Sequence, residues 1–280
     1  MLVLPQNYFN FVAELLFYIL FIRTEILMGF KITTLVENCA YHRKLQAEHG
    51  LSLYIETPDH TLLFDTGASD LFIHNARLLH LDLQKVDFVI LSHGHNDHTG
   101  GLRHFMEINK HAKVVCKPEI LAQKFKDDRE NGILHPDTLD RSRFLFVKDH
   151  TELVPGVIIF PNIEIVDSND THFDRFFVMK NSVKVSDTFQ DELAMALVDD
   201  KEISIISACS HRGVTNLLYS IHKLYPELTQ ALILGGFHIH NAEQAKYQVI
   251  ADYMKQNPPQ QVGVCHCTGV DKYAFFYRDF

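Results

Sequence analysis

The 280-residue sequence has no tryptophan, only five cysteines and no low-complexity segment. Apart from Cys265 and Cys267 the cysteines lie far apart, and their number is odd. This distribution argues against a disulfide framework and predicts a reducing, cytoplasmic compartment. A chain of this length buries an adequate core without disulfides. Hydrophobic residues make up 46% and charged residues 22%, so neither a disordered chain nor a membrane bundle is favoured.

Positive charge is scarce relative to negative charge. Lysine and arginine number 26 against 35 aspartates and glutamates, which gives a formal net charge of -9. Because a negatively charged protein repels phosphate backbones, we expect no nucleic-acid partner unless a local basic patch overrides the average. The expected partner is a small-molecule substrate, and the composition leaves the oligomeric state open.

The apolar run near the N-terminus is short. It extends from Phe9 to Ile22, about 14 residues, whereas a membrane-spanning helix needs about 20. No basic segment precedes it and no A-x-A-like site follows it, so it does not resemble a secretory signal. We expect residues 1–28 to be an apolar extension of a domain at 29–280. Three interpretations stay open: a packed helix, a membrane-surface anchor, which the length disfavours, or a segment upstream of a start at Met28.

From Lys31 onward, short apolar runs alternate with amphipathic stretches. The apolar runs predict strands at residues 51–57, 61–67, 86–92, 112–116, 144–147, 157–160, 231–234 and 261–264, and a hairpin of 193–200 with 202–210. Helical spacing of apolar residues predicts helices at 68–79, 102–109, 214–224 and 242–256. The charged and turn-rich middle, about 117–191, predicts loops and hairpins that wall a cleft.

Two parts of the chain have the same pattern. In each, an apolar strand ends in serine, histidine follows within a few residues, and a helix leads to another strand: VDFVILSHGH to AKVVC, and EISIISACSH to ALILGG. Residues just past strand ends are where α/β proteins build their sites. The sequence therefore predicts an α/β domain with a two-sheet core, helices outside it, and two similar halves.

Four potential metal ligands follow the strand predicted at 86–92: His93, His95, Asp97 and His98. In an extended chain, His93 and His95 project to the same side about 6.6 Å apart, and their imidazoles can share an ion with Zn–N bonds of about 2.0–2.1 Å. The other two lie where the chain turns and suit a second ion about 3.5–4 Å away. A polar loop whose histidines merely cluster is the alternative, but without a metal such crowding is costly.

The H-x-H-x-D-H segment resembles the signature of the metallo-β-lactamase-fold hydrolases, and the resemblance spans residues 31–268. The motifs FDTG (64–67), SACSHRG (207–213), GGFH (235–238) and CHCTG (265–269) are similar to those of one subgroup. That subgroup includes archaeal and bacterial metal-dependent hydrolases and synthases of methanopterin biosynthesis. The resemblance implies a four-layer αββα sandwich, which agrees with the two-halved pattern.

The resemblance also implies roles for residues outside this segment. His211 is the expected third ligand of the first ion, because it follows a buried strand as His93 does; the alternative is a helix-entry residue that caps or packs. His266, in the loop after the last strand, is the expected further ligand of the second ion. Asp97 would bind an ion and accept a hydrogen bond from the nucleophile, which makes it the expected catalytic residue.

Four further residues are expected around the ligands. Asp65 would orient a ligand imidazole from behind, His238 would contact either a ligand or the substrate, and His49 would lie near the cleft. No Gly-Asp pair supplies the family's bridging aspartate; Cys209 occupies a comparable place, as a bridging thiolate or as a small buried side chain. The remaining histidines are expected to be surface or packing residues: His42, His60, His74, His80, His104, His111, His135, His150, His172, His222 and His240.

Imidazole ligands with one carboxylate favour Zn²⁺, with one or two ions bound and Mn²⁺ or Fe²⁺ as alternatives at the second position. Such an ion lowers the pKa of bound water to about 7. The main hypothesis is therefore a metal-dependent hydrolase of a small, anionic ester or phosphoester. The alternatives are a synthase or transferase of a pterin-type pathway on the same scaffold and a non-catalytic metal- or ligand-binding protein. A di-iron oxygen-reducing protein is disfavoured, because that branch has Glu in place of His95.

Overall fold

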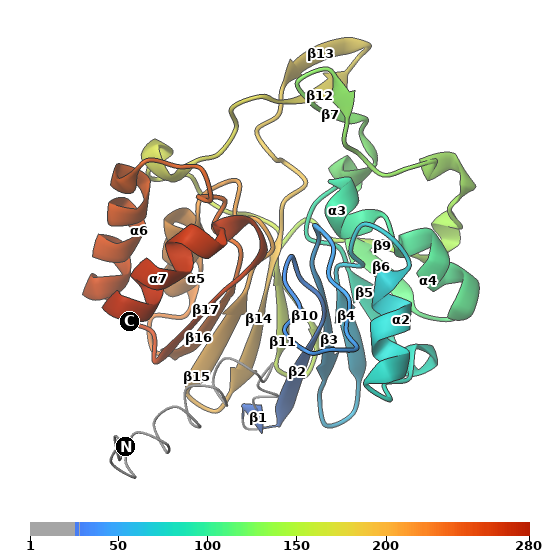
Figure 1. The fold of residues 1–280 in the computed structure, drawn as a ribbon, viewed down its shortest axis with the longest axis horizontal. Helices are drawn as coiled ribbons and strands as arrows, with labels where there is room; N and C mark the ends of the chain where they lie inside the picture. The colour runs from blue at the N-terminus through green and yellow to red at the C-terminus, as the bar shows by residue number, and fades with distance from the viewer. Residues whose placement is uncertain (1–25, 28) are drawn as a thin grey trace, which may run out of the picture.

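Two central β-sheets lie face to face, and each carries helices on its outer side (Figure 1). The structure is a computed structural model that describes residues 26–27 and 29–280. Most of the expected apolar extension, residues 1–25 and 28, lies outside the described residues. Among those that are described, no helix combines the length and apolar character needed to cross a membrane.

The first sheet is made of seven strands of the described chain. In spatial order they are β1 (Ile26–Leu27), β2 (Phe30–Val36), β3 (Ser52–Glu56), β4 (Thr61–Phe64), β5 (Phe88–Ile90), β6 (Lys113–Cys116) and β9 (Phe144–Phe146). β1 to β4 pair antiparallel, whereas β4, β5, β6 and β9 pair in parallel. Helices α2 (Leu71–Leu78) and α4 (Leu102–Ile108) pack on the outer face.

The second sheet contains six strands within the described part of the chain. In order they are β10 (Thr151–Val154), β11 (Val157–Phe160), β14 (Ala194–Asp199), β15 (Glu202–Ile206), β16 (Thr229–Gly235) and β17 (Gln261–Val264). The last three pair in parallel. Its outer face is covered by α5 (Val214–Leu224), α6 (Gln244–Gln256) and α7 (Val270–Asp279). The layers are thus helix, sheet, sheet and helix, and the predicted fold class is confirmed.

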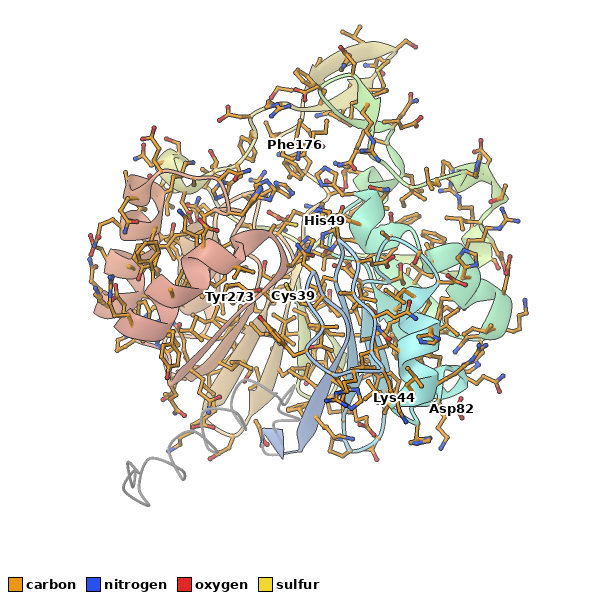
Figure 2. All side chains as sticks on the ribbon, viewed as in Figure 1. Cys39, Lys44, His49, Asp82, Phe176 and Tyr273 are labelled. Carbon is orange, nitrogen blue, oxygen red and sulfur yellow. The ribbon has the colours of Figure 1, made fainter. Side chains whose placement is uncertain are left out.

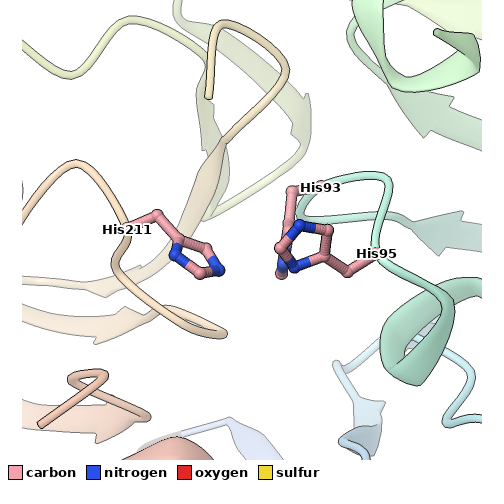
Figure 3. Close-up of side chains that lie close together, drawn as sticks. All are labelled: His93, His95 and His211. Carbon is pink, nitrogen blue, oxygen red and sulfur yellow. The ribbon is translucent and has the colours of Figure 1, made fainter. Parts of the chain in front are cut away.

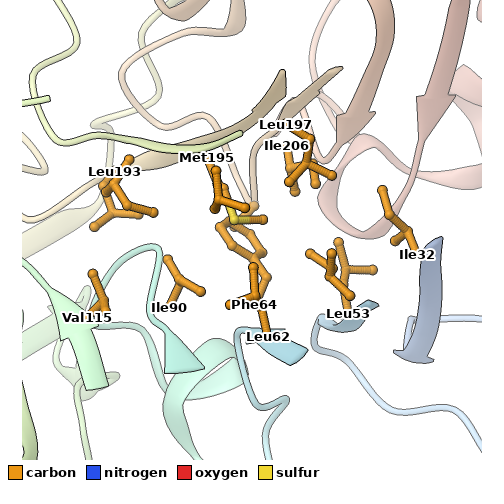
Figure 4. Packing of buried hydrophobic residues seen from close by; sticks show 14 of the residues in the cluster. Ile32, Leu53, Leu62, Phe64, Ile90, Val115, Leu193, Met195, Leu197 and Ile206 are labelled. Atoms are coloured by element: carbon orange, nitrogen blue, oxygen red, sulfur yellow. The ribbon is translucent and has the colours of Figure 1, made fainter. Parts of the chain in front are cut away.

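Alternation along each strand divides the hydrophobic side chains between the layers. Leu53 of β3 and Met195 of β14 belong to the cluster between the sheets (Figure 4), whereas the next residues, Tyr54 and Ala196, face the helices of their own side. Both faces of each sheet are therefore buried, which is why strands such as β5 have continuous apolar sequences.

A third, small sheet lies above the ends of the two central sheets (Figure 1). It has the order β13 (Val183–Ser186), β12 (Phe176–Lys180), β7 (Lys124–Lys126) and β8 (Arg129–Glu130). The prediction of loops and hairpins for 117–191 is confirmed for the adjacent pairs, β7 with β8 and β12 with β13. The pairing of β7 with β12 joins segments that are distant in the sequence, so no local pattern indicated it.

The other predicted elements are confirmed, with ends shifted by a few residues. The strand predicted at 61–67 ends at Phe64, because Asp65 has a left-handed backbone with φ of 58°. The strand predicted at 86–92 is the shorter β5, and the helix predicted at 68–79 begins at Leu71. Two helices were not predicted: α7 and the single turn α3 (Asn96–Thr99).

Candidate metal centre

The expected ligands come together at the end of the sandwich that lies beneath the small sheet. His93 follows β5 of the first sheet, and His211 follows β15 of the second. Figure 3 shows the His211 ring directed across the junction toward the rings of His93 and His95. The two similar halves therefore contribute to one site, because each places its ligands just beyond the end of a central strand.

His93, His95 and His211 form what we name the three-histidine group. One ring nitrogen of each lies within 4.8 Å of the others, and the ring centroids are separated by 4.7, 5.1 and 5.0 Å. All three side chains are buried, and no Nε2 atom among them has a hydrogen-bond partner. Burial lowers the pKa of each well below 6.5. Converging, neutral and unpartnered nitrogens are what a bound metal ion requires.

A second set of donors surrounds Asp97, and we name Asp97, His98, His266 and His49 the Asp97 group. Oδ2 of Asp97 lies 3.6 Å from Nε2 of His98, 3.4 Å from Nε2 of His266 and 3.3 Å from Nε2 of His49. His98 and His266 are buried, whereas the side chain of His49 is 69% exposed. His49 therefore lies at the rim, and the other members lie inside.

The electrostatics of the Asp97 group favour a negative Asp97 carboxylate beside a protonated His98. Burial lowers the pKa of His98, but the carboxylates of Asp97 and Asp65 outweigh burial and raise it from 6.5 to about 9. Burial raises the pKa of Asp97, but His98, His266 and His49 outweigh it and hold that pKa well below its usual range. The carboxylate is consequently negative at neutral pH, and a bound cation would take the place of the proton on His98.

Cys209 lies between the two groups. Its Sγ is 3.2 Å from Nε2 of His98, and it forms a three-donor set with His93 and His98. The thiol is 3% exposed, and burial raises its pKa well above the usual value. The expected alternatives, a bridging thiolate and a small buried side chain, are therefore both compatible with the position of Cys209.

Asp65 supports two of the expected ligands at once. Its Oδ2 lies 2.7 Å from Nδ1 of His98 and accepts a hydrogen bond from the Ser92 hydroxyl, whereas its Oδ1 accepts one from the Ser92 backbone N–H. The same hydroxyl lies 2.9 Å from Nδ1 of His93. A fully buried carboxylate thus directs the Nε2 atoms of both imidazoles toward the junction, as partners of metal-binding histidines commonly do.

A buried ion cluster that the sequence did not indicate holds the ligand loop from the other side. The backbone N–H of Gly94 donates to Oδ2 of Asp191 over 2.7 Å, and Nζ of Lys124 bonds to Asp191 at 2.8 Å and to Asp187 at 2.5 Å. Lys124 is 1% exposed. A side chain at position 94 would meet the backbone oxygen of Ile120 at 2.6 Å, so glycine allows the close approach.

Glu192 holds His211 in a similar way. Its carboxylate accepts hydrogen bonds from the backbone N–H groups of His211, at 2.6 Å, and Arg212, at 2.8 Å. Burial raises its pKa from 4.5 to about 7, even though these hydrogen bonds act in the opposite direction. Neither Glu192 nor Asp191 was predicted, because a single acidic residue before a strand has no distinguishing local pattern.

Aromatic rings enclose the three-histidine group. Phe189 stacks on His211 with centroids 3.8 Å apart and planes at 10°, and the Phe176 centroid lies 4.9 Å from that of His95. Phe176 comes from β12 of the small sheet, and Figure 2 shows it above His49. The sequence analysis did not identify these phenylalanines, since nothing in their local sequence distinguishes them from core residues.

Two further histidines lie next to these aromatic rings. The His238 ring lies 4.3 Å from that of His211 and 5.5 Å from that of His172. Nδ1 of His238 is buried without a partner. His172 was expected to be a surface or packing residue; it is 8% exposed, and its backbone oxygen lies 3.2 Å from Nδ1 of His211. Of the two expected roles, His172 therefore has that of a packing residue, and it packs beside the site.

Comparisons with known proteins found a matching family model and similar sequences. Residues 46–177 match the model of the metallo-beta-lactamase superfamily. The chain is 29% identical to a Methanocaldococcus jannaschii protein named 7,8-dihydropterin-6-methyl-4-(beta-D-ribofuranosyl)-aminobenzene-5'-phosphate synthase, over 89% of this chain and 91% of that protein.

Solved structures show the same fold. One, described as a metal-dependent hydrolase of the beta-lactamase superfamily, has a TM-score of 0.77 and 28% identity, and the match covers 90% of this chain and 93% of that one. A metallo-beta-lactamase fold protein from Bacillus subtilis has a TM-score of 0.52 at 13% identity, with 85% of each chain covered. The fold and the family match agree: the chain is similar to the metallo-beta-lactamase superfamily in sequence over residues 46–177 and in fold over 90% of its length.

Proposed function

We propose that the chain is a cytoplasmic, metal-dependent synthase or transferase that joins two small molecules, one of them a planar pterin-type compound. The observation that carries the proposal is the aromatic lining of the metal centre by Phe176 and Phe189. Both rings are buried in this structure, and Phe176, on the small sheet, is the ring whose displacement would expose a stacking face for a planar heteroaromatic substrate. The similarity to the dihydropterin synthase, which extends over 89% of this chain, supports the same class of substrate.

The donors fit the metal that the fold family implies. The three-histidine group offers three buried nitrogens without partners, and the Asp97 group adds a carboxylate and further imidazoles. This set suits Zn²⁺, with Mn²⁺ or Fe²⁺ as alternatives at the Asp97 group. When bound, the ion would polarise a substrate oxygen and stabilise the negative charge that develops there.

The protein's own residues would orient the reactants. The Asp97 carboxylate, kept ionised by its histidine neighbours, would accept a hydrogen bond from the N–H or O–H of the attacking group. His49, at the rim and 3.3 Å from Asp97, would contact the substrate as it enters. Lys126 of β7 is exposed, and its Nζ lies 5.5 Å from the Phe176 centroid, where it would attract an anionic substrate group.

A product assay tests the proposal. The zinc-loaded protein is incubated with an aminobenzene ribofuranosyl 5'-phosphate and a dihydropterin whose 6-methyl carbon carries an anionic leaving group, and the products are identified by mass spectrometry. The expected result is a condensation product, formed with loss of the leaving group and absent when a chelator is added. Release of the leaving group by water, without any condensation product, would contradict the proposal.

Hydrolysis of a small anionic ester or phosphoester is the second candidate. It is favoured by the similarity to the metal-dependent hydrolase, with a TM-score of 0.77 and 28% identity. In that case Asp97 would accept its hydrogen bond from water. A panel of phosphoesters, lactones and thioesters separates the two: a hydrolase converts one of them without an amine acceptor, whereas the proposed synthase needs both reactants. A protein that binds metal but converts nothing in either assay would contradict both.

A further inference from the structure

A group of sulfur and nitrogen donors lies beside the metal centre and shares only Cys209 with it. Sγ of Cys209, Sγ of Cys267 and a ring nitrogen of His238 all lie within 4.8 Å of one another. The cysteines are 3% and 5% exposed, and Nδ1 of His238 is buried without a hydrogen-bond partner. Within the described residues, Cys267 and His238 belong to no other three-donor group, so neither is explained by the ligand sets above.

The three donors are held by loops that are tied to one another. Cys209 follows β15, His238 follows β16 and Cys267 follows β17. The N–H of Gly236 donates to the oxygen of Ala208 over 2.8 Å, which joins the first loop to the second. The N–H of His240 donates to the oxygen of Cys267 over 3.2 Å, which joins the second to the third. The donors are therefore positioned by the backbone before any ligand binds.

The sulfur of Cys267 also fills a space that the backbone leaves open for it. A Cβ atom at Gly236 would lie 2.5 Å from Sγ of Cys267 and 2.5 Å from the oxygen of Ala208. The Cys267 thiol itself approaches the oxygen of Cys209 at 3.7 Å, a weak interaction that leaves the sulfur free to ligate. The loop after β16 can thus carry the third donor only because glycine makes room for the sulfur.

We propose that Cys209, Cys267 and His238 form an additional site for a thiophilic divalent cation such as Zn²⁺. Two thiolates and one imidazole select such ions over Mg²⁺ or Mn²⁺. Bonds of about 2.3 Å to sulfur and 2.0–2.1 Å to nitrogen place tetrahedral donors about 3.5–4 Å apart, a spacing that small side-chain rotations reach from 4.8 Å. Each thiol releases its proton to solvent on binding, and Cys209 connects this site to the histidine ligands.

Cadmium titration tests the proposal independently of any catalytic activity. Metal-free protein is titrated with Cd²⁺, and sulfur-to-cadmium charge-transfer absorption is followed in the ultraviolet until it saturates. The wild type is expected to show the absorbance of two thiolates per chain, and C267S half of it. C116S, which changes a buried cysteine of β6 that belongs to no donor group of the described chain, is the matched control and should equal the wild type.

Two results would overturn the proposal: no sulfur absorbance in the wild type, or undiminished absorbance in C267S. The second would mean that Cys209 alone ligates, from its set with His93 and His98. A measurement on the unaltered protein covers the case in which C267S does not fold. X-ray absorption at the zinc edge averages over all bound ions, so the sulfur coordination number is multiplied by the zinc content per chain. Fully loaded wild type should then give at least two zinc–sulfur bonds per chain, and one or none contradicts the site.

Discussion

The backbone N–H of Gly94, between the candidate ligands His93 and His95, donates to Oδ2 of Asp191 over 2.7 Å, although 97 positions separate the two residues. Asp191 in turn bonds to the buried Nζ of Lys124 at 2.8 Å. The loop that carries the ligands of one half is thus fixed to a segment that leads into the other half. This connection makes the geometry of the three-histidine group depend on a buried ion cluster outside it.

Replacing Lys124 should therefore cost more stability than replacing a lysine in a surface ion pair. K124M leaves Asp187 and Asp191 buried without their cation, and removal of one partner from a buried pair costs about 3 to 5 kcal/mol. K223M is the control: it breaks the exposed pair with Glu164, which is worth at most about 1 kcal/mol. Urea unfolding measures both, and equal losses in the two variants would contradict the role of the cluster.

D65N should weaken metal binding without unfolding the protein. Asparagine tolerates the left-handed backbone at position 65, but it replaces the carboxylate that faces Nδ1 of His98. We expect an affinity loss of about 10- to 100-fold, as is typical for partners of ligand histidines. Calorimetric zinc titration measures it, with D87N as the control because Asp87 pairs with His60 away from the site. Unchanged zinc affinity in D65N would show that His98 needs no such support.

H95A should abolish metal-dependent turnover and leave the fold intact. His95 is buried beside Phe176 and Phe189 but lies outside the three hydrophobic core clusters. Its removal therefore takes away a donor and little core. Its effect on turnover should exceed the roughly 10- to 100-fold that outer partners contribute. H104A, an exposed histidine of α4, is the control for activity and for circular dichroism. Wild-type turnover in H95A would exclude a metal-dependent mechanism at this site.

Glu192 should give the metal-free protein a specific pH dependence of stability. Its pKa in the fold, about 7, lies above the ordinary 4.5, so its contribution to stability is fully present below about pH 4.5 and is lost as the pH rises through 7. E192Q removes this loss. The free energy of unfolding of E192Q, relative to wild type, should therefore increase between pH 5 and pH 8, by at most about 3 kcal/mol.

Denaturant unfolding at the two pH values measures this difference, and E107Q is the control because Glu107 is exposed on α4. Subtracting the wild type cancels the titration of the site histidines. A relative stability of E192Q that falls from pH 5 to pH 8 would mean that Glu192 is held ionised in the fold.

The parts of the site that follow a local rule were accessible from the sequence. Strand alternation and the position of histidines just past strand ends indicated His93, His95 and His211 as ligands, and the family motifs indicated His266. The αββα layers were implied by the family resemblance, in agreement with the two-halved pattern along the chain. What was missed depends on contacts between distant segments: the pairing of β7 with β12 carries Phe176 over the site, and no local pattern connects Lys124 to Asp191.

The cysteines give a similar lesson. The spacing of Cys265 and Cys267 does not match a zinc ribbon, and read along the chain Cys267 has no partner. In space it lies beside Cys209, because β15, β16 and β17 are adjacent parallel strands whose following loops meet. Sequence spacing identifies donors on one loop, whereas donors from three loops become visible only when the sheet order is known.

The central claim is that the three-histidine group binds a metal ion, and metal content tests it most directly. Purified wild type is analysed for bound zinc by elemental analysis after exhaustive dialysis, beside H211A and the control H222A, which changes an exposed histidine of α5. The account predicts at least one zinc per chain in wild type and H222A and the loss of one ion in H211A. Equal zinc content in all three proteins, or no zinc in any of them after reconstitution, would contradict it.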